Sequence, residues 1–110
     1  MIIEDIRKAI KNKCQIEYTI HCLERMFSRG ISRSDVIDCI ETGELIEDYP
    51  LDKFNTSEKS FPSCLILGIR ISDSKRLHVV VGYNNDKILI ISVYYPDLEH
   101  WLEDYKTRRI

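Results

Sequence analysis

Three side chains that bind anions or exchange protons recur at four-residue steps: His21, Arg25 and Arg29. A helix turns about 100° per residue, so these positions form one stripe on a helix over residues 20–29. An arginine guanidinium binds two phosphate oxygens at once, and histidine is the side chain best suited to proton exchange near neutral pH. The stripe therefore predicts an anion-binding surface, although an ordinary solvated helix face would show the same spacing.

The same helix has an apolar side, which we expect to hold it to the rest of the protein. This side consists of Ile20, Leu23, Met26 and Phe27. Thr19 is a suitable N-cap for the helix. Gly30 is a suitable stop, because glycine adopts the left-handed backbone without a steric penalty.

A second group of polar side chains is expected on two strands, residues 76–83 and 87–95. A three-residue loop, Asn84-Asn85-Asp86, would pair Leu77 with Val93. One face would then gather Leu77, Val79, Val81, Tyr83, Leu89, Ile91, Val93 and Tyr95. The other face would gather Arg76, His78, Ser92 and Tyr94, with Arg70 as a further candidate from the neighbouring strand. A two-residue turn would change this grouping, and simple packing would explain His78 and Tyr94 one at a time.

Apolar residues three or four apart predict further helices. The first covers residues 3–12. A third helix begins after Ser32-Arg33-Ser34-Asp35, which has the form of a capping box, and ends before Gly43. A last helix is expected from near Asp97, with one apolar side: Leu98, Trp101, Leu102 and Tyr105.

Runs of β-branched and aromatic residues bounded by turn residues predict the strands. They cover residues 44–49, 63–71, 76–83 and 87–95. Short turns join the last three, so these should pair in antiparallel fashion. In residues 51–61 the apolar residues have no regular spacing, so this stretch is expected to form a loop. The prediction is an α+β domain over residues 1–110, with N-terminal helices on an antiparallel sheet of about four strands and a C-terminal helix.

Length and composition agree with one small domain. A chain of 110 residues with 44% hydrophobic content suffices for one core. The net charge of −2 argues against an indiscriminate nucleic-acid binder, but it leaves room for a local basic site and for the basic tail of Lys106, Arg108 and Arg109.

Several classes of protein find no support in the sequence. The four cysteines are scattered without metal-ligand spacing, so we expect reduced thiols and no metal. There is no Gly-rich phosphate loop or nucleophile elbow, and we expect no cofactor. Without an apolar signal region or a membrane-length run, we expect a cytoplasmic protein with no membrane partner.

Several motifs in a fixed order resemble a known bacterial family. They are His21-x-x-Glu24-Arg25-Met26-x-x-Arg29-Gly30-Ile31-Ser32, Asp35-Val36, Gly43-Glu44, Cys64-Leu65, Leu77-His78-Val79-Val80, Val93-Tyr94, and Trp101 with Thr107-Arg108-Arg109. Over about residues 15–109 the chain is similar to the family called domain of unknown function 4258. That family resembles the RelE-like toxins of toxin–antitoxin pairs, including the BrnT and MqsR types, whose fold packs N-terminal helices on a curved antiparallel sheet.

The resemblance implies a toxin that cleaves RNA without a metal ion and is neutralised by a small antitoxin protein. In such ribonucleases the 2′-hydroxyl attacks the adjacent phosphate, a base removes its proton, and cationic donors stabilise the phosphorane. Carried onto this chain, the catalytic candidates are His21, His78 and Tyr94. The candidates for binding RNA phosphates are Arg25, Arg29, Arg76, Arg108 and Arg109.

Two alternatives stay open at this point. A non-catalytic domain of the same fold would use Arg25 and Arg29 to hold nucleic acid or an acidic protein, and a housekeeping protein would bind an unrelated small molecule. The net acidity also departs from the strongly basic toxins that dock on ribosome-bound messenger RNA. A shared catalytic site has one structural requirement: the stripe on residues 20–29 must lie over the sheet face that carries His78 and Tyr94.

Overall fold

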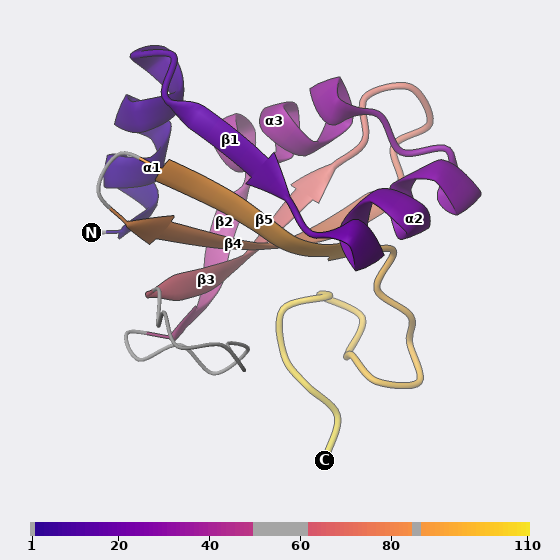
Figure 1. Cartoon of the computed structure of the whole chain (residues 1–110). Helices are drawn as coiled ribbons and strands as arrows, with labels where there is room; N and C mark the ends of the chain where they lie inside the picture. Colours follow the sequence, from indigo (N-terminus) through magenta and orange to yellow (C-terminus); the bar gives the residue numbers. More distant parts are fainter. Residues whose placement is uncertain (1, 50–61, 85–86) are drawn as a thin grey trace.

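The computed structural model describes residues 2–49, 62–84 and 87–110. In this part of the chain three helices cover one face of a five-stranded sheet (Figure 1). The elements are α1 (Ile2–Lys11), β1 (Gln15–Tyr18), α2 (Ile20–Arg29), α3 (Arg33–Thr42), β2 (Glu44–Tyr49), β3 (Ser63–Ile69), β4 (Arg76–Asn84) and β5 (Lys87–Tyr94). The α+β class is confirmed. The predicted loop over residues 51–61 lies outside the described residues.

The sheet differs from the prediction in strand number and direction. Its order is β1-β5-β4-β3-β2, and β1 pairs parallel with β5 whereas the other neighbours are antiparallel. An all-antiparallel sheet of about four strands is therefore wrong. The missed strand, β1, has only four residues, which is too short a run for periodicity to distinguish it from a loop.

The predicted caps of α2 are confirmed. Thr19 Oγ1 accepts a hydrogen bond from the Cys22 N–H at 3.0 Å and donates one to the Ile91 carbonyl at 2.9 Å. The cap therefore ties the start of α2 to β5. At the other end Gly30 has a left-handed φ of 67°.

The third helix, α3, is fixed at both ends. Ser32 Oγ accepts from the Asp35 N–H at 3.0 Å, and the Asp35 carboxylate accepts from the Ser32 N–H at 2.9 Å, so the predicted capping box forms. At the C-terminus, Arg7 of α1 donates to the carbonyls of Ile40 and Gly43 at 2.9 and 2.7 Å. A guanidinium stabilises this end, because the last carbonyls of a helix lack partners within it.

Each face of the sheet has its own apolar cluster. The helix-side cluster joins buried residues of all three helices to β3, β4 and β5. The opposite cluster is smaller and contains Leu65, Val80 and Trp101. Trp101 comes from the C-terminal segment, residues 95–110, which lies on the side of the sheet away from α1 and α3 (Figure 1). This segment therefore covers part of the second face.

The predicted C-terminal helix is wrong. Asp97 and Asp104 each accept hydrogen bonds from the backbone N–H groups two and three residues later. Asp97 caps a single helical turn, in which the Trp101 N–H donates to the Asp97 carbonyl, but the next N–H, that of Leu102, donates to the Thr107 carbonyl. The segment instead folds back on itself, and Trp101 and Arg108 pair in an isolated antiparallel bridge.

The pairing of β4 with β5 differs from the predicted register by two successive shifts. Near the turn Asn84 pairs with Lys87, and an irregularity after Val80 shifts the rest by one more residue. Between His78 and Val80 the total shift of two residues leaves each side chain on the face of the sheet where it was predicted. The grouping of His78 with Tyr94 on one face is therefore confirmed. The prediction is wrong for Leu89 and Ile91, because Ile88 and Ile90 are the residues buried under the helices.

None of the helices within these residue ranges is long and apolar enough to span a membrane.

Candidate nucleic-acid interface

His78 on β4 and Tyr94 on β5 lie directly opposite each other in the sheet register and form a hydrogen bond. His78 Nδ1 is 3.1 Å from Tyr94 Oη, and His78 Nε2 is 2.8 Å from the Tyr105 carbonyl oxygen. Because a carbonyl only accepts, the ring hydrogen must be on Nε2. Nδ1 then accepts the phenol hydrogen of Tyr94.

Burial keeps this pair uncharged. The His78 side chain is fully buried, and its ring lies 4.5 Å from the Trp101 ring, centroid to centroid, in an edge-to-face contact. Burial lowers the pKa of His78 below its ordinary 6.5, and it raises the pKa of Tyr94 above 10.0. At neutral pH the pair is a neutral imidazole and a protonated phenol.

Only one member of the pair reaches the surface. Tyr94 is half-buried, whereas His78 is enclosed by the sheet and the C-terminal segment. His78 can therefore act on a bound molecule only through Tyr94. The phenol oxygen gives its hydrogen to His78 and keeps lone pairs that can accept another proton.

The two arginines of the C-terminal tail hold their own segment in place. Arg108 Nε and Nη2 donate to the Glu47 carboxylate at 2.7 and 2.9 Å, and the guanidinium lies 4.7 Å from the Trp101 ring centroid. The hydrogen bond to Glu47 raises the pKa of Arg108 further above its ordinary value. Arg109 Nε donates to the Leu98 carbonyl. These contacts fasten residues 98–109 over the sheet.

Arg76 is differently placed. It begins β4 on the same face as His78, is exposed, and its guanidinium lies 5.8 Å from the Tyr105 ring centroid. No carboxylate among the described residues forms an ion pair with it. Arg76 is therefore a free cation near the Tyr94–His78 pair.

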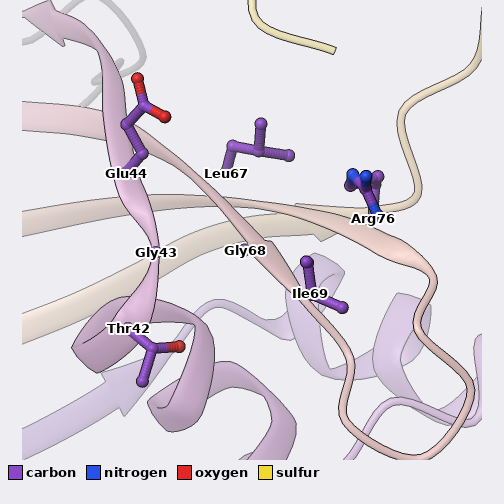
Figure 2. A pocket seen from close by; sticks show the side chains of 7 residues that line it. All are labelled: Thr42, Gly43, Glu44, Leu67, Gly68, Ile69 and Arg76. Atoms are coloured by element: carbon purple, nitrogen blue, oxygen red, sulfur yellow. The ribbon is translucent and has the colours of Figure 1, made fainter. Parts of the chain in front are cut away.

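Arg76 also forms part of two surface hollows. The first, about 270 Å³, is lined by Thr42, Gly43, Glu44, Leu67, Gly68, Ile69 and Arg76 (Figure 2). The second, about 340 Å³, is lined by Ser74, Lys75, Arg76, Tyr95, Pro96 and Tyr105. Both contain apolar or aromatic side chains beside a cation, a combination typical of surfaces that bind single-stranded nucleic acid.

The stripe of His21, Arg25 and Arg29 lies on α2 as predicted. Within the described part of the chain, these side chains make no hydrogen bond or ion pair, and Glu24 does not compensate them. Three cationic or titratable groups at successive four-residue steps repel one another when charged. The stripe is thus suited to an anionic partner.

The side of α2 that holds the helix to the protein differs from the prediction. Cys22 and Met26 are buried, whereas Ile20 and Phe27 are 78% and 91% exposed. The Thr19 cap places the helix beside β5 where β1 ends, and this anchor sets which side faces the core. Cysteine behaves as a small apolar residue, so Cys22 belonged in the predicted apolar side.

The structure does not bring the α2 stripe and the Tyr94–His78 pair into one site. Met26 packs in the helix-side core with Val79 and Val93, whereas His78 and Tyr94 face the opposite core. A catalytic site that contains both His21 and His78 is therefore not formed. Arg29, the last residue of the stripe, instead contacts a residue that lines the second hollow. Tyr95 Oη donates to the Arg29 carbonyl at 3.4 Å.

Arg70 does not join the His78 face. Its guanidinium lies 3.3 Å from the Asp35 carboxylate and 3.6 Å from that of Asp73, and it donates to Tyr95 Oη. These partners fix the turn between β3 and β4 against α3. Ser92, in contrast, pairs with Val80 on the predicted face.

Two buried thiols, those of Cys39 and Cys64, are unsuited to nucleophilic chemistry. Burial raises the pKa of Cys39 and of Cys64 to about 12, so both are protonated at neutral pH. In the ranges that the structure describes, no cluster of His, Cys, Asp and Glu side chains could hold a metal ion.

Comparison with known proteins places the chain in a family. Residues 18–95 match the family described as domain of unknown function (DUF4258). The chain belongs to this family. No curated protein and no solved structure matches it. The matched residues of this DUF4258 domain include the α2 stripe, Arg76, His78 and Tyr94, whereas Trp101, Tyr105 and Arg108 lie beyond them.

Sequence reasoning missed several groups that shape the site of this DUF4258 domain. The Tyr105 carbonyl fixes the tautomer of His78, and Glu47 engages Arg108. A backbone carbonyl leaves no mark in a sequence pattern. Lys75, however, adjoins Arg76 just after a polar turn, and that pair of neighbouring cations was a usable indication of a basic site.

Proposed function

We propose that this domain binds RNA on the sheet face that carries Arg76, His78 and Tyr94, and that it acts there as a toxin-type, metal-independent endoribonuclease. The observation that carries the proposal is the Tyr94–His78 hydrogen bond beside a free cation. Tyr94 is partly exposed, His78 is a neutral acceptor behind it, and Arg76 has no ion-pair partner in the described chain. The resemblance to RelE-like toxins supports the choice of RNA as substrate.

The geometry supports a proton relay during cleavage. The 2′-oxygen forms a bond to phosphorus as the bond from phosphorus to the 5′-oxygen breaks. Tyr94 Oη accepts the 2′-hydroxyl proton while its own hydrogen passes to His78 Nδ1. The resulting imidazolium is stabilised by its Nε2–H bond to the Tyr105 carbonyl, and Arg76 stabilises the charge on the phosphorane. The proton then returns through Tyr94 to the 5′-oxygen, which leaves a 2′,3′-cyclic phosphate and a 5′-hydroxyl.

The remaining residues would extend the interface. RNA beyond the reacting phosphate would follow Tyr95 to Arg29 and Arg25 on α2, since Tyr95 contacts the Arg29 carbonyl. In this proposal His21 contacts the RNA backbone and takes no part in the relay. The proposal includes a small antitoxin protein as partner, for which the exposed Ile20 and Phe27 side chains offer apolar contacts.

A second candidate function is a non-catalytic binding domain of the same fold. One observation favours it: both ring nitrogens of His78 are already bonded within the protein, and the ring is fully buried. In that case His78 serves only to fasten the C-terminal segment. RNA binding would persist, but cleavage would be absent.

Expression in bacteria distinguishes the two functions. We expect the wild-type protein to arrest growth and Tyr94→Phe, which removes the relay oxygen, to abolish the arrest. Tyr18→Phe is the matched control, because Tyr18 packs against the helix-side core, and it should still arrest growth. Normal growth with well-expressed wild type that binds RNA would favour the binding domain, and arrest by Tyr94→Phe would refute the relay.

A further inference from the structure

We propose that Arg76 binds the phosphate between two successive nucleotides of single-stranded RNA, with one base in each of the two hollows beside it. The inference rests on the proposed function in taking RNA as the ligand. It adds the position of the two nucleotides and a base preference on one side.

The placement of Arg76 carries the proposal. Its side chain lines both hollows, so a group held by its guanidinium lies between them. Figure 2 shows Arg76 at one side of the first hollow, across from Glu44 and near Leu67 and Ile69. Volumes of about 270 and 340 Å³ lie just below and just above the lower limit of pockets for drug-sized ligands, about 300 Å³, which suits a single base in each.

The second hollow has the chemistry of a base-stacking site. Two aromatic rings line it, and each lies beneath a cation: Lys75 Nζ is 5.4 Å from the Tyr95 centroid, and Arg76 is 5.8 Å from the Tyr105 centroid. A cation over an exposed ring is held weakly, whereas a phosphate accepts short, charge-assisted hydrogen bonds. A bound phosphate would therefore draw these cations away from the rings and leave the aromatic faces to a base.

The first hollow combines an apolar floor with hydrogen-bond acceptors. Leu67 and Ile69 supply the floor, and the Glu44 carboxylate lies at the rim. Glu44 is 3.0 Å from Lys106 Nζ, so its charge is compensated and does not repel a nearby phosphate. A carboxylate accepts hydrogen bonds from the amino group of a base. This hollow should therefore prefer cytosine, adenine or guanine to uracil.

The same placement brings the phosphate to the relay. Arg76 and His78 are two residues apart on one strand and on one face, a rise of about 6.6 Å. An arginine side chain extends over such a distance. The phosphate held by Arg76 is then the one presented to Tyr94, the strand partner of His78.

Binding of short, uncleavable RNA tests the inference. The probes are the dinucleotides CpC and UpU and a 12-residue RNA, all 2′-O-methylated so that the 2′-oxygen cannot attack. Amide NMR shifts report where they bind and whether each variant is folded. We expect CpC to shift residues that line the two hollows, Arg76→Gln to weaken CpC about tenfold, and UpU to bind more weakly than CpC.

A matched pair of α2 substitutions separates the two-nucleotide site from the longer interface. Arg25→Gln with Arg29→Gln should leave CpC affinity unchanged but weaken the 12-residue RNA, and Lys11→Gln on α1 should change neither. If Arg76→Gln binds CpC as the wild type does, or if CpC shifts only α2, the two-nucleotide site is refuted while RNA binding stands. If the wild type binds neither CpC nor the 12-residue RNA, the proposed function itself fails.

Discussion

Replacing His78 by alanine should lower the free energy of unfolding by about 3 kcal/mol, as expected for loss of a buried, doubly hydrogen-bonded side chain. The substitution leaves a cavity beside Trp101 and deprives the Tyr94 hydroxyl and the Tyr105 carbonyl of their partner. Urea denaturation followed by Trp101 fluorescence measures the change. His21→Ala is the matched control, because His21 is exposed and its side chain makes no hydrogen bond within the described residues.

The stability of the wild type should also depend on pH through His78. The pKa of His78 is 6.5 in the unfolded chain and lower in the folded protein, so the unfolded state binds the proton more readily. This contribution to stability is therefore complete above about pH 6.5 and is lost as the pH falls through the lowered, folded-state pKa. His78→Ala should flatten this part of the pH profile. Equal stability of His78→Ala and His21→Ala would show that His78 does not fasten the C-terminal segment.

Replacing Tyr94 by phenylalanine should slow RNA cleavage by about 100-fold or more, the usual contribution of a positioned proton-transfer group. The ring and its packing remain, so the loss reports the hydroxyl that bridges RNA and His78. Initial rates on a short RNA in the presence of EDTA measure the effect, with Tyr18→Phe as control. A rate for Tyr94→Phe within twofold of the wild-type rate would contradict the relay.

The wild-type rate should have an acid limb set by His78. Only the neutral imidazole accepts the relayed proton, so the rate should fall as His78 becomes protonated. Because burial lowers the pKa of His78, the midpoint of this limb should lie below 6.5. A midpoint above 6.5 would indicate that another group is the base.

Local features of the fold could be predicted because their causes are local. Thr19, Gly30 and the Ser32–Asp35 box act within a few residues of themselves, and the helices that they bound formed as expected. The C-terminal helix stops after a single turn because the Leu102 N–H bonds to the Thr107 carbonyl of the returning chain, a contact that apolar spacing does not report. β1 depends on pairing with a strand about 70 residues away, which no local pattern specifies.

The sequence predicted which strands and which sheet face carry His78 and Tyr94. It did not predict which of the candidate site residues come together. Parity along β4 and β5 put His78 and Tyr94 together, even though two register shifts separated the predicted pairing from the real one. The rotation of α2 was not predictable, because the Thr19 contact to Ile91 sets it from outside the helix. For that reason His21 could be placed on a stripe, but its separation from His78 could not be foreseen.

The most direct test of RNA cleavage on this sheet face uses the wild-type protein, a short RNA and EDTA, with the same sequence as DNA in parallel. We expect cleavage of the RNA alone, with 2′,3′-cyclic phosphate and 5′-hydroxyl ends. Equal cleavage of the DNA, a requirement for added metal, or no cleavage of RNA that is bound would each contradict it.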